Sequence, residues 1–342
     1  MYSSYSSLQQ SQLAAQGYYD TQSTYLLVYA PGRNTALRAT LADQLHRKFR
    51  LADTLGSALT EGVDGVLLVS EDVECMSTAL MCFAKALQDG ADYAVCNAVF
   101  GFGGATALYQ SRAHLAQNRC ALVSRPLLER CRAAAKDPEN VTELLALAAQ
   151  FCAHPARIPQ ALLHYERDIC AEDAFSATGK RAFLMSHVLD MTGAPIVLVS
   201  AVPVLRSMGY EVVVLGPSDG GALQLFVDAG AAVITRPGIR ATPNLWGLAL
   251  CTDLVLVNTV VMARTVRALS GTAVPVLWWL HDAFAGYPHI AHQIPTKLAE
   301  NVRLYSVGHH AANAMHAVRP DFQIGQLIYG LPDYAAEDFP RC

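Results

Sequence analysis

The alternation of apolar and polar positions predicts a series of strands and helices that is most regular in the second half of the chain. Short apolar runs predict strands at 182–187, 211–215, 232–236, 253–258, 274–281, 303–307 and 324–329. Apolar residues at helical spacing predict helices near 195–208, 222–229, 260–269, 293–301 and 309–317. Because apolar strands that alternate with helices form parallel sheets covered on both faces, this half predicts a Rossmann-like, doubly wound fold.

The first half shows a looser form of the same alternation. Apolar runs predict buried strands over 25–31 and 65–72, and Asn34 is placed to cap a helix that continues to about Lys48. Further strands are predicted in ADYAVCNAVF and CALVS, helices in CMSTALMCFAKALQDG, RPLLERCRAAA and NVTELLALAAQF, and an extended segment in ARIPQALLHYE. The whole chain is therefore expected to be α/β.

A segment without apolar periodicity, 167–181, separates the two halves. Domain boundaries fall in segments of this kind, where few contacts cross the chain. The chain is therefore expected to comprise a flexible polar tail at 1–22, one Rossmann-like domain at 23–168, a linker at 169–181 and a second Rossmann-like domain at 182–342.

Composition narrows the class of protein. The 342 residues are 52% hydrophobic and carry a formal net charge of −4 with no basic run, which argues against binding of nucleic acid. The nine cysteines form no CxxC pair and predict buried, reduced thiols rather than a disulfide framework or a zinc site. We find no signal peptide and no unbroken apolar span of membrane length, so we expect a cytoplasmic protein without a transmembrane segment.

Candidate chemistry begins where the first strand of the second half ends, at Ser186-His187, and continues into the loop Gly193-Ala194-Pro195. A proline suits the first turn of a helix, so this loop is predicted at a helix N-terminus, where free N–H groups favour an anion. Taken alone, a plain strand-to-helix turn is the favoured interpretation. The loop lacks GxGxxG and GxxxxGK[ST], which disfavours a nicotinamide dehydrogenase and excludes a P-loop kinase.

Five segments of the second half, in order, resemble the N-terminal domain of family 4 glycosyltransferases of the GT-B fold. They are LMSHVLDMTGAPIVLVSAVPVLRSMGYEVVVLGP, GGALQLFVDAGAAVITRP, DLVLVNTVV, VPVLWWLHDAF and LYSVGHHAANAMHAVRPDFQIGQLIYGLPDY. The resemblance implies a nucleotide-sugar donor and a glycan or other hydroxyl acceptor, and it requires no metal. It also implies that a partner domain or subunit completes the cleft, because the chain ends at Cys342, where the second GT-B domain is expected to begin.

The family 4 resemblance assigns roles to individual residues. It implies that Gly193, Ala194 and Pro195 approach the donor or the acceptor. It implies that His281, in WWLHD, is the catalytic residue near the transferred sugar, with Asp282 beside it in the donor site. His187 is interpreted as a structural residue at the end of a strand.

The first half resembles a shortened family 2 glycosyltransferase of the GT-A fold. The matching segments are GVLLVSEDVECMSTALMCFAKAL, CALVSRPLLERC and ARIPQALLHYER. The resemblance implies that Asp72 holds Mg²⁺ or Mn²⁺ and that Glu143 occupies the position of the family's catalytic acidic residue, although Ser70 replaces the first acidic position of the metal motif. The segment between Lys48 and Gly65 is short, which predicts the loss of a strand and a helix that the family has there.

The sequence therefore leaves two classes of function open. The first is a glycosyltransferase, or a fragment of one, that transfers a sugar from a nucleotide-sugar to a hydroxyl group. The second is a non-catalytic pseudo-glycosyltransferase or a module that binds a partner or an acceptor. The motifs SHVLDMTGAP and WWLHDAF favour ligand binding, whereas the shortened first domain favours loss of independent catalysis.

Overall fold

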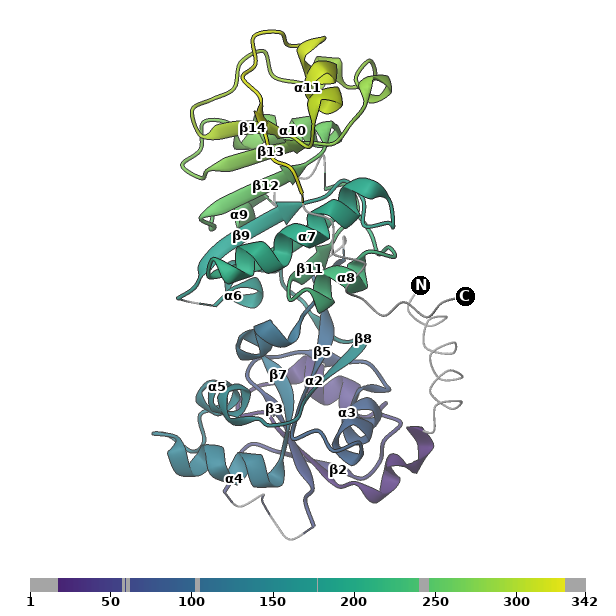
Figure 1. The fold of residues 1–342 in the computed structure, drawn as a ribbon. Coiled ribbons are helices and arrows are strands. Elements are labelled where there is room, and N and C mark those ends of the chain that lie inside the picture. The colour runs from purple at the N-terminus through teal and green to yellow at the C-terminus, as the bar shows by residue number, and fades with distance from the viewer. Residues whose placement is uncertain are drawn as a thin grey trace, which may run out of the picture. The chain divides into compact units, whose positions relative to one another are not determined.

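The computed structural model describes residues 18–329, except 57–58, 60–61, 102–104, 177 and 240–245. The chain divides into two compact units, Met1–Thr178 and Gly179–Cys342. Each unit contains a sheet flanked by helices (Figure 1), which confirms the predicted α/β class. The YGLPDY turn that contributes to the family 4 resemblance falls almost entirely outside the described residues.

The sheet of the first unit is mixed. Its strands run in the order β2 (Phe49–Ala52), β1 (Leu26–Tyr29), β3 (Gly65–Val69), β7 (Cys120–Ser124) and β5 (Tyr93–Phe100). Strand β5 also pairs with β6 (Thr106–Tyr109) and β8 (Pro155–Tyr165), and β8 pairs with β4 (Glu74–Cys75). The pairs of β1 with β2 and β3 are parallel, whereas β7 is antiparallel to both of its neighbours.

Helices of the first unit cover this sheet. They are η1 (Tyr18–Ser23), α2 (Thr35–Leu41), α3 (Ala79–Gln88), η2 (Arg112–Gln117), α4 (Arg125–Ala134), α5 (Val141–Phe151) and α6 (Ala171–Ala174). The side chains of Ser124 and Asn140 accept N–H groups in the first turns of α4 and α5, so local capping fixes where both begin. Buried Leu127 and Leu144 on these two helices join Val66 of the sheet in one core.

Two predictions for the first unit are wrong. The helix that begins after Asn34 ends at Leu41 rather than near Lys48, and a strand is present where the short spacing predicted a deletion. Phe49 pairs in parallel register with Leu26, so the segment adds an edge strand to the sheet. The strand conformation of this segment therefore depends on backbone pairing with a strand distant in sequence. The length of the segment alone could not reveal that pairing.

The predicted tail and linker also differ in part from the structure. Residues 1–17 of the tail lie outside the described residues, but Tyr18–Ser23 forms η1. The predicted linker contains α6, where the buried carboxylate of Asp173 accepts two hydrogen bonds from Arg167, at 2.7 and 2.8 Å. This ion pair orders a segment that lacks apolar periodicity.

The sheet of the second unit is parallel throughout. Its strands run in the order β15 (Gly325–Gln326), β14 (Val302–Ser306), β13 (Val276–Leu280), β12 (Leu254–Asn258), β9 (Lys180–Met185), β10 (Tyr210–Gly216) and β11 (Ala232–Thr235). All seven strands predicted for this half are present within a few residues of their predicted ends. The central strands are buried on both faces, which explains why their sequences are apolar throughout.

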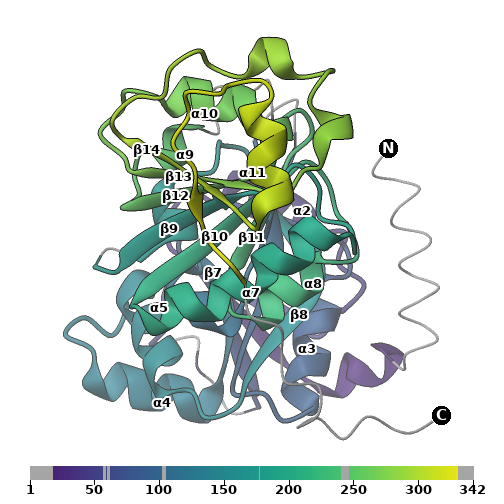
Figure 2. The same ribbon diagram turned by 45° about the horizontal axis from the view of Figure 1, so that its top comes forward.

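Helices α7 (Gly193–Ser207) and α8 (Leu223–Asp228) lie side by side against the sheet (Figure 2). The remaining helical elements are α9 (Trp246–Ala249), η4 (Val260–Met262), α10 (Ala263–Leu269), η5 (Phe284–Gly286), η6 (Ala291–Gln293) and α11 (His309–His316). The helix predicted at 293–301 is wrong. Pro295 disfavours helical backbone at the residue before it, and the Arg319 guanidinium donates to the carbonyls of Ile294 and Pro295 instead.

The order of strands in the second unit reverses between β9 and β12. From β9 the chain moves to β10 and β11 on one side and then returns to β12 on the other side of β9. Helix α7 packs against both β10 and β12, and so lies over this reversal. Open parallel sheets bind ligands at such a point, beyond the carboxyl ends of the strands.

Within the described residues, every cysteine is free, and five of them, from Cys75 to Cys131, are buried. The prediction of buried thiols therefore holds for these five. None of the described helices has the length and apolar character needed to cross a bilayer.

Candidate functional site

The loop between β9 and α7 is held by its own polar groups and by the loop that follows β10. The Leu189 carbonyl accepts a hydrogen bond from the Ala222 N–H at 2.9 Å. The Asp190 carboxylate accepts hydrogen bonds from the N–H and the hydroxyl of Thr192. Helix α7 then begins at Gly193, so the loop places the N-terminus of this helix at the carboxyl edge of the sheet.

The predicted ligand residues Gly193, Ala194 and Pro195 form the first turn of α7. The N–H groups of a first helical turn have no carbonyl partner within the helix, so those of Gly193 and Ala194 favour an anion. An added Cβ on Gly193 would meet nothing within 4 Å, so the surface beside it is open. The side-chain amide of Asn258 donates to the Ala194 carbonyl at 3.0 Å and ties this turn to the end of β12.

His187 and Thr259 meet across the reversal of strand order. His187 follows β9, Thr259 follows β12, and the His187 Nδ1 and Thr259 Oγ1 atoms lie 3.2 Å apart. Thr259 has a φ of 71°, a left-handed conformation that is strained for a β-branched residue. Hydrogen bonds to the backbone of Trp279 and from the indole of Trp278, both 2.8 Å, hold it there. Strain retained in this way is typical of functional sites.

His281 and Asp282, at the end of β13, lie beside this pair. The His281 ring packs on Trp279 with 4.7 Å between centroids. Burial, reinforced by the charge of nearby His187, lowers the pKa of His281 to about 4, so its imidazole is neutral near pH 7. The Asp282 carboxylate accepts a hydrogen bond from the Val260 N–H at 2.6 Å. Burial raises the pKa of this carboxyl above its usual value, although that hydrogen bond and the charge of His187 both act to lower it.

Several buried polar atoms at this edge have no hydrogen-bond partner among the described residues. They include Asn258 Oδ1, His281 Nε2 and Ser306 Oγ, which lie at the carboxyl ends of β12, β13 and β14, and the Tyr287 hydroxyl that follows them. A buried polar group without a partner costs about 1–3 kcal/mol. Such groups cluster where water or a ligand completes the hydrogen bonding. The carboxyl edge of the second sheet is therefore the candidate site.

His187 lies close to three other titratable groups of this site. In its protonated form it lowers the pKa of Asp190, His281 and Asp282, which belong to the loops after β9 and β13. The structure therefore gives His187 a more central position than the sequence suggested. The Tyr287 phenol also belongs to this group, because burial and then the charge of Asp282 raise its pKa.

Asp72 of the first unit caps a helix. Its carboxylate accepts hydrogen bonds from the N–H groups of Ala36 and Leu37, at 3.1 and 3.0 Å, and from the Thr35 hydroxyl at 3.1 Å. Partial burial raises the pKa of this carboxyl, but these hydrogen bonds outweigh it and the net pKa lies below the usual value. Both oxygens that the sequence assigned to a divalent cation are thus engaged with the N-terminus of α2.

The other polar residues of the predicted metal motif also contact the protein. The Ser70 hydroxyl donates to the Arg119 carbonyl at 2.9 Å, and Glu74 lies 2.7 Å from His164. The Glu143 carboxylate accepts two N–H groups of the loop before α5. Among the residues that the structure describes, no three His, Cys, Asp or Glu side chains are grouped so that they could hold a metal ion.

Residues 178–316 match the family model described as Glycosyl-transferase family 4. The match covers most of the second unit, including β9 with its loop, the strained turn after β12 and the His281-Asp282 pair. It supports the family 4 resemblance and a glycosyltransferase-like second unit. The matched range begins at the last residue of the first unit, and the comparisons lend no support to the family 2 resemblance. No curated protein and no solved structure gave a match.

Sequence reasoning missed three residues of the site. Asn258 and Thr259 lie at the end of an apolar strand, within the DLVLVNTVV segment of the family 4 resemblance, but that resemblance assigned them no role, and Tyr287 lies in an irregular segment. The position of Asn258 at the end of a predicted strand, in a segment that contributes to the family 4 resemblance, was the available signal. The left-handed backbone of Thr259 could not be foreseen, because it depends on contacts with β13.

Proposed function

We propose that the second unit is one half of a glycosyltransferase that transfers a sugar from a nucleotide-sugar donor to a hydroxyl group of a glycan or another acceptor. The observation that carries this proposal is the set of unpaired buried polar atoms along the carboxyl edge of the second sheet, within the range that matches the family model. Ligand binding at that edge would give these atoms the partners they lack.

The N-terminus of α7 is proposed to face the phosphate groups of the donor or the acceptor. The N–H groups of Gly193 and Ala194, together with the helix dipole, favour negative charge there. Fixed dipoles of this kind stabilise a leaving diphosphate without the need for a metal ion. A partner domain or a second subunit is proposed to supply the opposite wall of the cleft.

His281 is proposed to contact the transferred sugar. Its neutral ring can exchange a hydrogen bond with a sugar hydroxyl through Nε2, which lacks a partner in the described part of the chain. Asp282 is proposed to line the same site, held by the Val260 N–H. His187 is proposed to set the local charge, with Thr259 holding its ring.

Calorimetric titration of the full chain with UDP-, GDP- and dTDP-sugars tests this proposal. We expect one class of nucleotide-sugar to bind with equal affinity in the presence and absence of Mn²⁺. His281→Ala is expected to weaken binding and transfer more than His289→Ala, an exposed histidine of the same unit. Absence of binding by every nucleotide-sugar would refute an autonomous donor site.

The alternative function is a non-catalytic module that binds a partner or an acceptor. The acidic residues of the first unit favour this alternative, because the carboxylates of Asp72, Glu74 and Glu143 already form hydrogen bonds with other groups of the same chain. On this view Asp72→Asn keeps one acceptor oxygen at the N-terminus of α2, has little effect on stability and changes no Mn²⁺ response. Mn²⁺-dependent donor binding that Asp72→Asn removes would instead favour a metal-dependent transferase in the first unit.

A further inference from the structure

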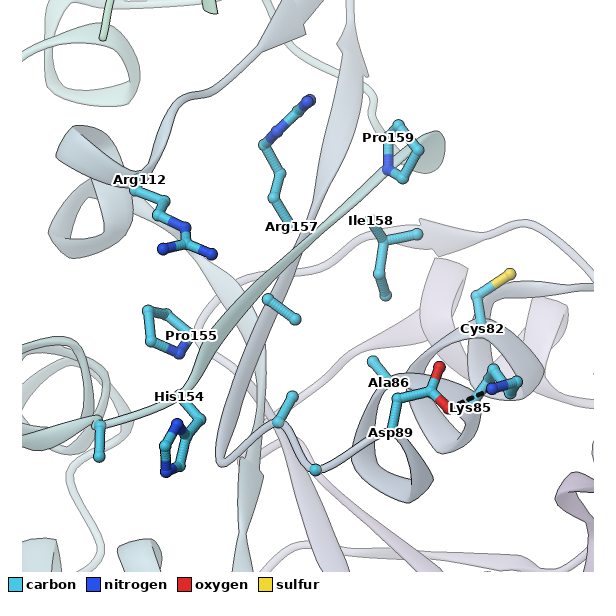
Figure 3. A pocket seen from close by; sticks show the side chains of 14 residues that line it. Cys82, Lys85, Ala86, Asp89, Arg112, His154, Pro155, Arg157, Ile158 and Pro159 are labelled. Carbon is cyan, nitrogen blue, oxygen red and sulfur yellow. Dashed lines mark hydrogen bonds and ion pairs between the residues drawn. The ribbon is translucent and has the colours of Figure 1, made fainter. Parts of the chain in front are cut away.

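The first unit contains a cavity of about 450 Å³ that the proposed function does not use (Figure 3). Its walls come from the second half of α3 and the turn that follows it, from Arg112 of η2, and from residues 153–159 around the start of β8. Strands β3, β5 and β8 point in the same direction, because β7 is antiparallel to β3 and β5 and β8 is parallel to β5. The cavity at the amino ends of β5 and β8 is therefore at the edge of the sheet opposite to Ser70 and Asp72.

Small residues leave the backbone of this cavity accessible. Ala86, Gly90, Ala91, Ala153 and Ala156 contribute to its lining. Gly90 has a φ of 93°, which ends α3 in a conformation that other residues adopt only with strain. The backbone here is thus exposed to a ligand without bulky side chains in between.

Asp92 holds the loop that forms one wall. Its carboxylate accepts hydrogen bonds from the N–H groups of Ala153 and His154, at 2.8 and 2.9 Å, and its own N–H donates to the His154 carbonyl at 3.1 Å. Three hydrogen bonds to two adjacent residues fix the start of β8 before any ligand arrives. A wall that is ordered in advance lowers the entropic cost of binding.

The lining is positively charged, in contrast to the chain as a whole. It carries the permanent cations Lys85, Arg112 and Arg157 against one carboxylate, Asp89, whereas the full chain has a net charge of −4. Lys85 forms an ion pair with Asp89 and so neutralises it. In Figure 3, Arg112 extends beside Pro155 on the side of β8 where His154 also lies, across the cavity from that ion pair.

We propose that this cavity binds a small phosphorylated molecule. A guanidinium group presents paired donors that match phosphate oxygens, and His154 adds a further donor on the same side. The volume exceeds that of a phosphate group alone and falls in the range of small-molecule sites. Pro155, Ile158 and Pro159 provide an apolar surface for the remainder of the ligand. This inference does not rest on the glycosyltransferase proposal.

Calorimetric titration of the full chain with inorganic pyrophosphate at low ionic strength tests the site. Arg112→Ala is expected to weaken binding about tenfold, the effect of losing one charge-assisted contact. Ala86→Glu places a carboxylate in the cavity without removing a ligand contact and is expected to weaken binding at least as much. Arg130→Ala, at an exposed arginine of α4 in the same unit, is expected to leave binding unchanged.

Two results would overturn this inference. The first is absence of pyrophosphate binding by the wild-type chain. The second is pyrophosphate binding that Arg112→Ala and Ala86→Glu leave unchanged but that Gly193→Ala removes. Such binding would belong to the second unit, so it would refute this cavity as a site and would not contradict the proposed function. Conversely, Arg112-dependent binding of pyrophosphate by a chain that binds no nucleotide-sugar would support this site and refute the proposed donor site.

Discussion

Gly220 leaves space for the loop between β9 and α7, and its replacement by alanine should disturb that loop. A Cβ atom at this position would lie 2.2 Å from the Leu189 carbonyl oxygen and 3.1 Å from the Asp190 nitrogen. These are backbone atoms, so no side-chain rotation relieves the overlap. The same Leu189 carbonyl accepts the Ala222 N–H, so the two loops must separate as the methyl group enters.

Overpacking of this kind typically costs about 1–3 kcal/mol. The φ angle of Gly220 lies outside the left-handed region, so the cost is steric and not a matter of backbone strain. For a unit of this size, each kcal/mol lowers Tm by roughly 2–4 °C. We therefore expect a lower unfolding midpoint in urea for the second unit of the Gly220→Ala variant.

Tryptophan fluorescence during urea unfolding measures this effect selectively. All three tryptophans of the chain, Trp246, Trp278 and Trp279, belong to the second unit. Gly193→Ala is the matched control, because an added Cβ there meets no atom within 4 Å. It should unfold at the wild-type urea concentration, and it should weaken the proposed binding of a nucleotide-sugar. A Gly220→Ala variant with the wild-type midpoint would refute the steric reasoning.

Two further predictions concern acid stability and the ordered segment after β8. Because burial lowers the pKa of His281 to about 4, its contribution to stability is complete above the unfolded pKa near 6.5 and is lost as pH falls from there towards 4. Tryptophan fluorescence should show this loss in the wild type and less of it in His281→Gln; equal losses would contradict it. Asp173→Ala should destabilise the first unit by about 2 kcal/mol or more, because the variant removes the buried one of the two carboxylates that accept from Arg167. Hydrogen exchange in α6 should rise, and unchanged protection would exclude this ordering role.

Local pattern was sufficient for most of the second unit. Its strands are apolar because helices and neighbouring strands bury them, so their sequences identify them without further information. The same reasoning failed for β2, because Phe49–Ala52 is only half buried and owes its conformation to pairing with β1. It failed for 293–301, where Arg319 holds the backbone carbonyls in an irregular path.

The candidate site shows a similar division. The start of α7 at Gly193 follows from the Gly-Ala-Pro loop, since a proline two residues on suits a first helical turn. The prominence of His187 does not follow from its neighbours in sequence. It depends on Thr259 and Asp282, which lie far along the chain. They come close to His187 only because β12 pairs with β9 and β13 pairs with β12 in the sheet.

The sequence by itself determined the α/β class, the parallel strands of the second unit and the loop that begins α7. These features depend on apolar periodicity and on the local chemistry of Gly and Pro, both of which act over a few residues. Tertiary structure alone decided which polar groups meet at the reversal of strand order, that Thr259 adopts a left-handed backbone, and that Asp72 caps a helix. These features depend on strand order and long-range hydrogen bonds, which no short stretch of sequence encodes.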